Sequence, residues 1–226
     1  MVVEGEVLIR EARDAGWEIE SQFFAPGSEP LDIPGQIFAL APGVLEKVAS
    51  THTPQPHLAI VRVPAQPVDL LTTASFVIVA YEVGDPGNLG TMMRSAEAAG
   101  ADLLVLCAGT VDATNPKVVR ASAGSFFRLP VLTVETLAEV NRPGREILGT
   151  SSHLGQDYTS VDLRRDIALV FGNEARGLDA DLPVDQWVTI AHRGTSESLN
   201  VAMACTILCF EVARQRRLPS GTVGER

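Results

Sequence analysis

Three short segments of this chain combine glycines with polar side chains in a way that suits a binding site. The first runs from Asp85 to Arg94 and reads Asp-Pro-Gly-Asn-Leu-Gly-Thr-Met-Met-Arg. Its glycines, Gly87 and Gly90, allow another backbone or a ligand to approach closely, and Asn88 is a suitable N-cap for a helix. Because a guanidinium is charged at physiological pH, Arg94 places a positive charge in the first turns of that helix, near the open end of a loop.

The other two segments follow later in the chain. In Leu169–Leu178, an apolar strand runs into Gly172, presents Glu174 and turns again at Gly177. In Ser196–Ala202, polar side chains lead an otherwise apolar helix. We therefore expect polar groups from both segments at the ends of secondary-structure elements, where ligands of α/β proteins bind.

Each segment also has a purely structural explanation. The first fits a capped helix with a surface arginine, and the second fits a strand–turn–helix connection with a solvated glutamate. In the third, Ser198 and Asn200 fit ordinary N-capping of a helix. The occurrence of all three in one chain favours a shared site over three separate local explanations.

Several other chemistries have little support in the sequence. No Gly-x-Gly-x-x-Gly or Gly-x-x-x-x-Gly-Lys-Ser/Thr follows the apolar segment Ser75–Tyr81, which argues against a usual dinucleotide or P-loop site. Ser151-Ser152-His153 contains hydrolase residue types, but no Gly-x-Ser-x-Gly surrounds a serine. The four histidines lack metal-ligand spacing, so we expect no metal; they are His52, His57, His153 and His192.

The composition is that of a globular protein. The chain has 226 residues, 46% of them hydrophobic and 20% charged, which suits one or two domains and is too apolar for a disordered chain. Its apolar runs are shorter than the roughly 20 residues of a membrane-spanning helix, and its N-terminus lacks a signal pattern. The cysteines lie in apolar runs (Cys107, Cys205 and Cys209), so we expect a reduced, cytoplasmic protein with no membrane association.

Short periodic segments predict two structural units separated by Pro64-Ala-Gln-Pro67. The first unit has a helix and three strands, with a short helix from Pro42 between the second and third strands. The predicted ranges are Glu4–Gly16 for the first helix and Trp17–Phe24, Gln36–Leu40 and His57–Val63 for the strands. The second unit has strands over Ser75–Tyr81, Asp102–Cys107, Leu129–Val134, Glu146–Thr150, Ile167–Phe171 and Trp187–Ala191.

Helices alternate with the strands of the second unit. One is expected over Leu89–Ala99, one from Asn115-Pro116 with the asparagine as N-cap, and a long closing one over Glu197–Arg217. This alternation predicts an α/β fold with a largely parallel sheet. The closing helix is apolar through Leu199, Met203, Ile207 and Phe210, which fits either core packing or a contact between subunits.

The three segments together resemble the motifs of the SpoU/TrmH-type RNA ribose 2′-O-methyltransferases of the SPOUT superfamily. The first motif, Asn-x-Gly-x-x-x-Arg, is matched by Asn88, Gly90 and Arg94. The second, Phe-Gly-x-Glu-x-x-Gly-Leu, is matched by Phe171, Gly172, Glu174, Gly177 and Leu178. The third, Ser-Leu-Asn-Val-x-x-Ala, is matched from Ser198 onward. The resemblance covers residues 70–217 and includes the connecting segment Asp112–Gly124.

Residues 1–65 resemble, more weakly, the small ribosomal-protein-like substrate-binding domain of many members. Val3-Glu-Gly5 and the stretch from Leu40 to Val63 carry this likeness. Many members have a basic segment ahead of the Val-Glu-Gly element, and the printed chain begins almost at that element. Two alternatives follow, a start assigned too late or a member without the segment, and with both of them open no RNA affinity is assigned to that arm.

The resemblance implies a domain organisation and a topology. Residues 1–67 would form an RNA substrate-binding domain, and residues 68–226 a methyltransferase domain with a parallel sheet and a deep trefoil knot. Pattern reasoning alone does not propose a knot, because knots are nearly absent from proteins. The family also implies a homodimer, with the last helix and the first-motif helix near the interface.

The resemblance implies catalytic roles for Arg94, Asn88, Glu174, Ser198 and Asn200. We expect Arg94 to hold the phosphate next to the target ribose and to lower the effective pKa of its hydroxyl, because that hydroxyl is a weak nucleophile. Asn88 and Glu174 would orient the arginine and the ribose, while Ser198 and Asn200 would complete the pocket.

S-adenosylmethionine is the implied cofactor. The residues expected to bind it are Thr150, Ser151, Ser152, Phe171, Gly172, Asn173, Glu174, Gly177, Ile190, Ser198 and Leu199. The residues expected to contact RNA are Arg94, Lys117, Arg120 and Arg128.

The implied function is methylation of a ribose 2′-hydroxyl, with 23S ribosomal RNA favoured over transfer RNA by the N-terminal domain. The alternatives are a transfer RNA 2′-O-methyltransferase and a non-catalytic RNA-binding or ribosome-assembly protein on the same fold. The net charge of −10 first argues against nucleic acid. Because the candidate RNA contacts gather in one region of the second domain, we expect a local arginine-lined cleft on an acidic body instead.

Overall fold

The computed structural model describes residues 1–49, 53–191, 194 and 198–217. Its N-terminal part is a four-stranded sheet with the spatial order β1-β4-β2-β3. The strands are β1 (Val2–Glu4), β2 (Ile19–Phe24), β3 (Gln36–Ala39) and β4 (His57–Val61). Helix α1 (Glu6–Asp14) packs against β1 and β4, and α2 (Leu45–Val48) is one short turn.

The sequence prediction of a helix from Glu4 was wrong at its first residue. Val2–Glu4 pairs with β4 as a strand, and Gly5, at a φ of +96°, separates that strand from α1. A positive φ is accessible to glycine at little cost. The chain can therefore turn directly from an edge strand into the helix that covers it.

The second part is a seven-stranded, entirely parallel sheet with the order β7-β6-β5-β10-β8-β11-β9. Its strands are β5 (Phe76–Ala80), β6 (Leu103–Cys107), β7 (Val131–Val134), β8 (Glu146–Thr150), β9 (Gln156–Asp157), β10 (Ile167–Phe171) and β11 (Gln186–Thr189). The predicted α/β class and parallel sheet are confirmed, whereas the two-residue strand β9 was not predicted.

Helices cover the sheet unequally. One face carries α4 (Pro86–Ala99), α5 (Pro116–Ala121), α6 (Ser125–Arg128) and α7 (Val201–Arg217). The other face is covered by α3 (Leu70–Thr73), by the short 3₁₀ helix η1 (Leu137–Val140) and by apolar residues of the segment 178–184. A second 3₁₀ turn, η2 (Tyr158–Ser160), lies beside α7. Every residue of β5, β6 and β10 is buried, as expected for central parallel strands.

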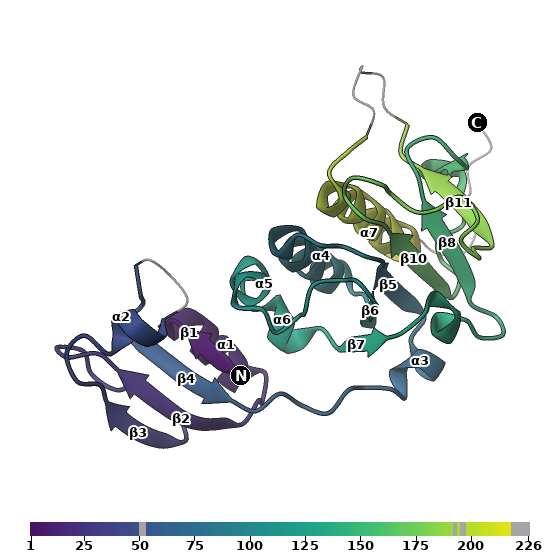
Figure 1. Cartoon of the computed structure of the whole chain (residues 1–226). Helices are drawn as coiled ribbons and strands as arrows, with labels where there is room; N and C mark the ends of the chain where they lie inside the picture. Colours follow the sequence, from purple (N-terminus) through teal and green to yellow (C-terminus); the bar gives the residue numbers. More distant parts are fainter. Residues whose placement is uncertain (50–52, 192–193, 195–197, 218–226) are drawn as a thin grey trace.

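The N-terminal part meets the larger part beside α5 and α6 (Figure 1). The Trp17 indole donates a hydrogen bond to the backbone oxygen of Phe127 at 3.0 Å, and its ring packs edge-on against the Phe127 ring. Arg128 forms ion pairs with Glu97 of α4 and Glu11 of α1. The four-stranded sheet is thus attached to the helices of the larger sheet, although the connecting residues 62–69 are extended apart from one turn.

Helix α4 begins earlier than the sequence suggests. Asp85, not Asn88, is its N-cap, because the Asp85 carboxylate accepts a hydrogen bond from the Asn88 amide at 2.8 Å. Pro86 then occupies the first helical position, where its missing N–H costs nothing. The predicted cap at Asn115 is confirmed, since its side chain accepts from the Lys117 amide.

The closing helix α7 is described from Val201 onward, and Ser196 and Glu197, where the sequence placed its start, lie outside the described residues. Its buried side consists of small and apolar residues, among them Ala202, Cys205, Leu208, Cys209 and Val212. The four apolar residues singled out in the sequence are exposed instead: Leu199, Met203, Ile207 and Phe210. Core packing within this chain therefore does not explain why these four positions are apolar.

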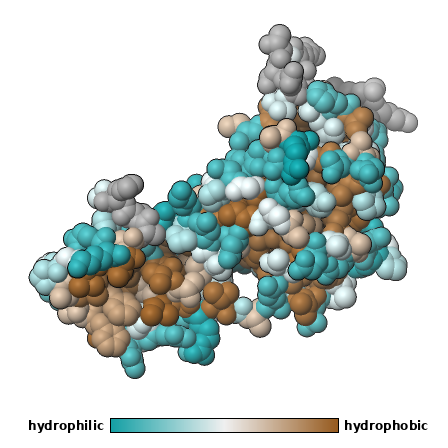
Figure 2. All heavy atoms as spheres, in the orientation of Figure 1, coloured by the Kyte–Doolittle hydropathy of each residue, from teal (hydrophilic) through white to brown (hydrophobic). Residues whose placement is uncertain are grey.

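No helix in the described part of the chain is long and apolar enough to cross a membrane. Hydrophobic side chains do reach the surface in places, including the N-terminal part at left in Figure 2. On β3, Ile37 and Phe38 are both exposed, and the Phe38 ring stacks on that of Phe23.

Gly90 explains how α4 and α5 pack so closely. A Cβ atom at this position would lie 2.5 Å from the Cβ of Ala121 and 2.7 Å from the backbone oxygen of Val118. The close approach expected at this glycine is therefore to a neighbouring helix. Both contacts belong to a packed interior, where room for an added methyl group comes only by moving a helix.

We predict that Gly90→Ala lowers the free energy of unfolding by about 1–3 kcal/mol, because it forces α5 away from α4. Urea denaturation followed by circular dichroism measures this effect. Thr91→Ala, at the exposed neighbouring position, is the matched control and should change the value by less than about 0.5 kcal/mol. Equal stability of Gly90→Ala and the wild type would contradict this account of the glycine.

Candidate functional site

A cavity of about 420 Å³ lies at the carboxyl ends of β8, β10 and β11. Its walls come from three loops and from the first turns of α7. In a parallel sheet the carboxyl ends of neighbouring strands meet at one edge, so loops that are distant in sequence converge there. The volume is in the range of small-molecule sites in proteins.

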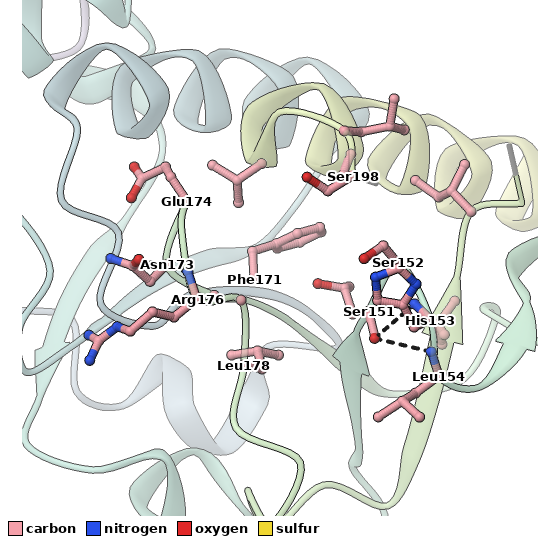
Figure 3. A pocket seen from close by; sticks show the side chains of 18 of the residues that line it. Ser151, Ser152, His153, Leu154, Phe171, Asn173, Glu174, Arg176, Leu178 and Ser198 are labelled. Carbon is pink, nitrogen blue, oxygen red and sulfur yellow. Dashed lines mark hydrogen bonds between the residues drawn. The ribbon is translucent and has the colours of Figure 1, made fainter. Parts of the chain in front are cut away.

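The cavity gathers the residues that the sequence predicted to bind a cofactor (Figure 3). Every one of them lines it: Thr150, Ser151, Ser152, Phe171, Gly172, Asn173, Glu174, Gly177, Ile190, Ser198 and Leu199. Their predicted neighbourhood is therefore observed, while cofactor binding by these residues stays a prediction. Apolar side chains such as Leu154, Val201 and Leu208 complete the lining.

The loop after β10 is shaped by Asn173 and two glycines. The Asn173 side-chain oxygen accepts hydrogen bonds from the amides of Ala175 and Arg176, and the Gly177 amide donates to the Asn173 backbone oxygen at 2.8 Å. A Cβ at Gly172 would lie 2.4 Å from the Gly177 oxygen, and Gly177 itself has a φ of +70°. The loop therefore closes on itself tightly and leaves Glu174 at its tip.

Glu174 ties this loop to the start of α4. Its carboxylate accepts hydrogen bonds from the amide of Asp85 at 3.0 Å, from the amide of Gly84 at 3.2 Å and from Asn88 Nδ2 at 3.1 Å. Partial burial raises the pKa of Glu174, but these hydrogen bonds outweigh it, so the pKa lies below the ordinary value of 4.5. Glu174 is therefore a carboxylate at neutral pH, with its oxygens already engaged.

Asn88 also connects Glu174 to the third motif. Its side-chain oxygen accepts a hydrogen bond from Asn200 Nδ2 at 2.9 Å. The Asn200 oxygen in turn accepts from the amides of Ala202 and Met203, so Asn200 caps α7. One hydrogen-bonded chain, Glu174–Asn88–Asn200, thus joins the three segments that the sequence singled out.

Arg94 lies outside this chain of hydrogen bonds. It is exposed on α4 and does not line the cavity. It forms no hydrogen bond or ion pair with any other residue that the structure describes. The expectation that Asn88 and Glu174 orient Arg94 is therefore not met within one chain, because both are engaged with each other and with Asn200 or the α4 amides. Ser198 does line the cavity.

The remaining residues predicted to contact RNA have different surroundings. Lys117 is exposed in the first turn of α5. Arg120 is partly buried and lines a smaller cavity of about 150 Å³ between the N-terminal part and α5. Arg128 is held by Glu97 and Glu11, and these hydrogen bonds raise its pKa further. Its charge is largely used in attaching the two parts of the molecule.

Sequence reasoning missed two residues of the site. Asp85 lies ahead of the helix predicted over Leu89–Ala99, although its position directly before Pro86 is a usual one for an N-cap. Arg176 lines the cavity and pairs with Glu82 at 2.6 Å; its signal was its place inside the second motif. Within the residues that the structure describes, no group of three or more His, Cys, Asp or Glu side chains could hold a metal ion.

Comparisons with known proteins agree with this geometry. The model of the SpoU rRNA Methylase family matches residues 75–210. The Bacillus subtilis 23S rRNA (guanosine(2553)-2′-O)-methyltransferase RlmP is 35% identical over 219 residues, which cover 93% of this chain and 87% of that protein. The match therefore includes both the cavity and the Glu174–Asn88–Asn200 chain.

Solved structures are similar as well. The SpoU methyltransferase AviRb from Streptomyces viridochromogenes, in complex with its cofactor AdoMet, has a TM-score of 0.85 at 29% identity and covers 96% of this chain and 90% of that chain. A structure concerned with 2-OH methylation of C/U34 on tRNA has a TM-score of 0.56 at 27% identity, and it covers 62% of this chain and 95% of that chain. The first similarity extends over both sheets, and the second over part of the chain.

We predict that Glu174→Gln lowers the melting temperature at neutral pH, because an amide is a weaker acceptor for the α4 donors than a carboxylate. The pKa of Glu174 is depressed in the folded state, so its contribution is fully present above pH 4.5 and is lost as the pH falls through the folded pKa. Calorimetry of wild type and variant should show a gap that closes on acidification. Glu29→Gln, at an exposed position, should show no such gap, and a gap independent of pH would contradict the assignment.

Proposed function

The chain belongs to the SpoU rRNA Methylase family, and we propose on this premise that it transfers a methyl group from S-adenosylmethionine to a ribose 2′-hydroxyl of 23S ribosomal RNA. The observation that carries the proposal is the hydrogen-bonded chain Glu174–Asn88–Asn200 at the rim of the cavity. It brings all three motifs of an RNA 2′-O-methyltransferase to one place, which a degraded, non-catalytic member would not need to preserve. We also propose a cytoplasmic location, because the proposed substrate is ribosomal RNA.

The cavity fits S-adenosylmethionine in size and chemistry. Apolar walls from Leu154, Ile190 and Leu199 suit the adenine, and serine hydroxyls suit the polar parts of the molecule. The sulfonium and ammonium groups of the cofactor are cationic, and Glu174 supplies a carboxylate at one side of the cavity. The glycines Gly172 and Gly177 allow backbone groups to contact the ligand directly.

When bound, S-adenosylmethionine supplies an electrophilic methyl group on sulfur. Transfer requires the ribose oxygen, the methyl carbon and the sulfur to be in line. The C–O bond would form as the C–S bond breaks, the cofactor would leave as the neutral thioether S-adenosylhomocysteine, and the hydroxyl proton would pass to solvent water. Glu174 is a poor proton acceptor because its pKa is lowered and three donors occupy it. We therefore assign Glu174, Asn88 and Asn200 to positioning the loops, and Ser198 to completing the pocket.

Arg94 is the residue we assign to the substrate. Its guanidinium is exposed and free of described partners, so it is available for a phosphate beside the target ribose. Holding that phosphate lowers the effective pKa of the neighbouring hydroxyl. Lys117 and Arg120 are assigned to further phosphate contacts, as expected from the sequence, and Arg128 contributes there only if it leaves its carboxylate partners.

The substrate assignment rests on the extent of the similarities. The relative and the structure that match almost the whole chain include its N-terminal four-stranded sheet, and the relative acts on 23S ribosomal RNA according to its name. The structure concerned with transfer RNA matches 62% of the chain. We therefore assign residues 1–67 to an RNA substrate-binding domain and residues 68–226 to the methyltransferase domain, with transfer RNA as the second candidate substrate.

The order of the strands supports the trefoil knot that the resemblance implies. Strand β10 is inserted between β5 and β8, and β11 then lies outside β8. Helix α7 returns across the sheet to the start of β5, where Arg216 donates to the Ser75 oxygen at 2.8 Å. Gln215 bonds both Val161 and Leu163 in the segment before β10. We propose that these crossings form the knot.

An exposed apolar stripe supports a homodimer. Met203, Ile207 and Phe210 are four and three residues apart, so they lie on one side of α7. Helix α7 packs beside α4 through a 2.6 Å hydrogen bond between Ser95 and Thr206. Arg94, next to Ser95, is exposed on the same helix layer. We propose that this stripe contacts a second copy and that Arg94 faces the partner, which explains why no described residue of its own chain pairs with its side chain.

We predict that Arg94→Ala abolishes methyl transfer and leaves cofactor affinity within about twofold, because Arg94 does not line the cavity. Tritiated methyl incorporation into an unmodified 23S ribosomal RNA transcript measures the first effect, and calorimetry with S-adenosylmethionine measures the second. An unmodified transfer RNA mixture is assayed in parallel. Sustained transfer by Arg94→Ala would remove Arg94 from the reaction, and transfer to transfer RNA alone would replace the substrate.

We predict that Phe210→Glu converts a dimeric protein into a monomer, because a carboxylate in an apolar contact is left without a partner. Sedimentation velocity gives the mass of each species. Val7→Glu, which likewise places a carboxylate at an exposed apolar position but on α1, should remain dimeric. A wild-type monomer, or a Phe210→Glu dimer, would show that the stripe is not the interface.

A further inference from the structure

Arg176 is the only lysine or arginine among the described residues that line the cavity. It follows Glu174 in the loop after β10, and its side chain is 71% exposed. Figure 3 shows that it extends from this loop beside Asn173, on the side of the cavity opposite Ser151, Ser152 and His153. The guanidinium therefore reaches outward from the rim of the cavity.

Two contacts set the position of Arg176. Its backbone amide donates to the Asn173 side chain at 3.2 Å, and its guanidinium donates to Glu82 at 2.6 Å. Glu82 lies two residues beyond the end of β5, at a φ of +56° that is unusual for a residue other than glycine, and its backbone oxygen accepts a hydrogen bond from Asn173 Nδ2. The backbone of Arg176 is thus bound to the loop after β10 and its guanidinium to the loop after β5. The hydrogen bonds of Glu174 join the same two loops.

These two contacts leave several hydrogen-bond donors of the Arg176 guanidinium without a described partner. A guanidinium has five N–H donors, and among the described residues Glu82 is the one partner of the Arg176 side chain. The high exposure keeps the other donors accessible. An exposed pair with one carboxylate also contributes little stability, so replacing or sharing that partner costs little.

The start of α4, the other group near this rim with affinity for anions, is already occupied. Helix N-termini bind anions through their free amides. Here the amides of Gly84 and Asp85 donate to Glu174, and the Asn88 amide donates to the Asp85 carboxylate. An anionic substrate that approaches this rim therefore meets two carboxylates at the helix start, and Arg176 as the nearby cation.

We propose that Arg176 binds a backbone phosphate of the RNA next to the target nucleotide, with Glu82 holding the guanidinium in reach. The proposal rests on the proposed function and extends it by a second phosphate contact at the cavity rim. Arg176 could bind any oxyanion, including the carboxylate of the cofactor. Its outward direction and exposure favour the phosphate. Such contacts fix the register of a nucleic acid on a protein.

The test compares Arg176→Gln with wild type on two ligands. Binding of an unmodified 23S ribosomal RNA transcript is measured by filter retention over a range of salt concentrations, and binding of S-adenosylmethionine by calorimetry. We expect Arg176→Gln to weaken RNA binding about fivefold to tenfold, with a salt slope smaller by about 0.7 for the lost contact. Cofactor affinity should stay within twofold, and Arg176→Lys should restore part of the RNA affinity because it retains the charge.

Arg164→Gln is the matched control. Arg164 is likewise exposed and ion-paired to one carboxylate, that of Asp162, and it does not line the cavity. It should bind the transcript as wild type does. Unchanged RNA binding by Arg176→Gln overturns the proposal, as does an equal loss in Arg164→Gln. A loss confined to the cofactor overturns it in favour of a carboxylate contact.

Failure of the proposed function gives a different pattern. Wild type that neither binds nor methylates the transcript contradicts the proposed function together with this inference. Wild type that methylates the transcript, while Arg176→Gln binds it equally well, contradicts the inference alone.

Discussion

The carboxylate of Glu174 is the interaction on which the site depends. It accepts three hydrogen bonds from the loop after β5 and the start of α4, and through Asn88 it reaches Asn200 at the start of α7. These elements are far apart in the sequence and meet only because the parallel sheet brings their ends to one edge. A charged acceptor makes stronger hydrogen bonds than a neutral one, so one side chain holds the walls of the cavity in register.

The acidic character of the chain is compatible with an RNA substrate when charge is considered locally. The net charge of −10 gives no general attraction for phosphates. Many arginines are also used internally, as Arg128 is in attaching the N-terminal sheet. Arg94, Lys117 and Arg176 remain exposed on the domain that contains the cavity. RNA recognition would then depend on these few positively charged side chains at fixed positions. Such an arrangement favours selective binding of one RNA site over strong binding to any RNA.

Much of the fold and of the cavity could be predicted from the sequence, because apolar strands and ordered motifs are local signals. The alternation of strands and helices predicted the parallel sheet, and motif residues predicted the cavity lining. The features that could not be predicted depend on residues that are distant in the sequence but close in space. Gly90 makes room for Ala121 of another helix. Asn88 forms its hydrogen bonds with Glu174 and Asn200 and none with Arg94. The apolar stripe of α7 faced outward because small residues such as Cys205 already filled the inner side.

The central claim is that the cavity presents a methyl group to a ribose hydroxyl of RNA. The most direct measurement uses S-adenosylmethionine with an isotopically labelled methyl group, an unmodified 23S ribosomal RNA transcript and mass spectrometry of the digested nucleosides. The account predicts label in a single 2′-O-methylated nucleoside, on the sugar. Label on a base, or RNA without label when the protein binds both cofactor and transcript, would contradict it.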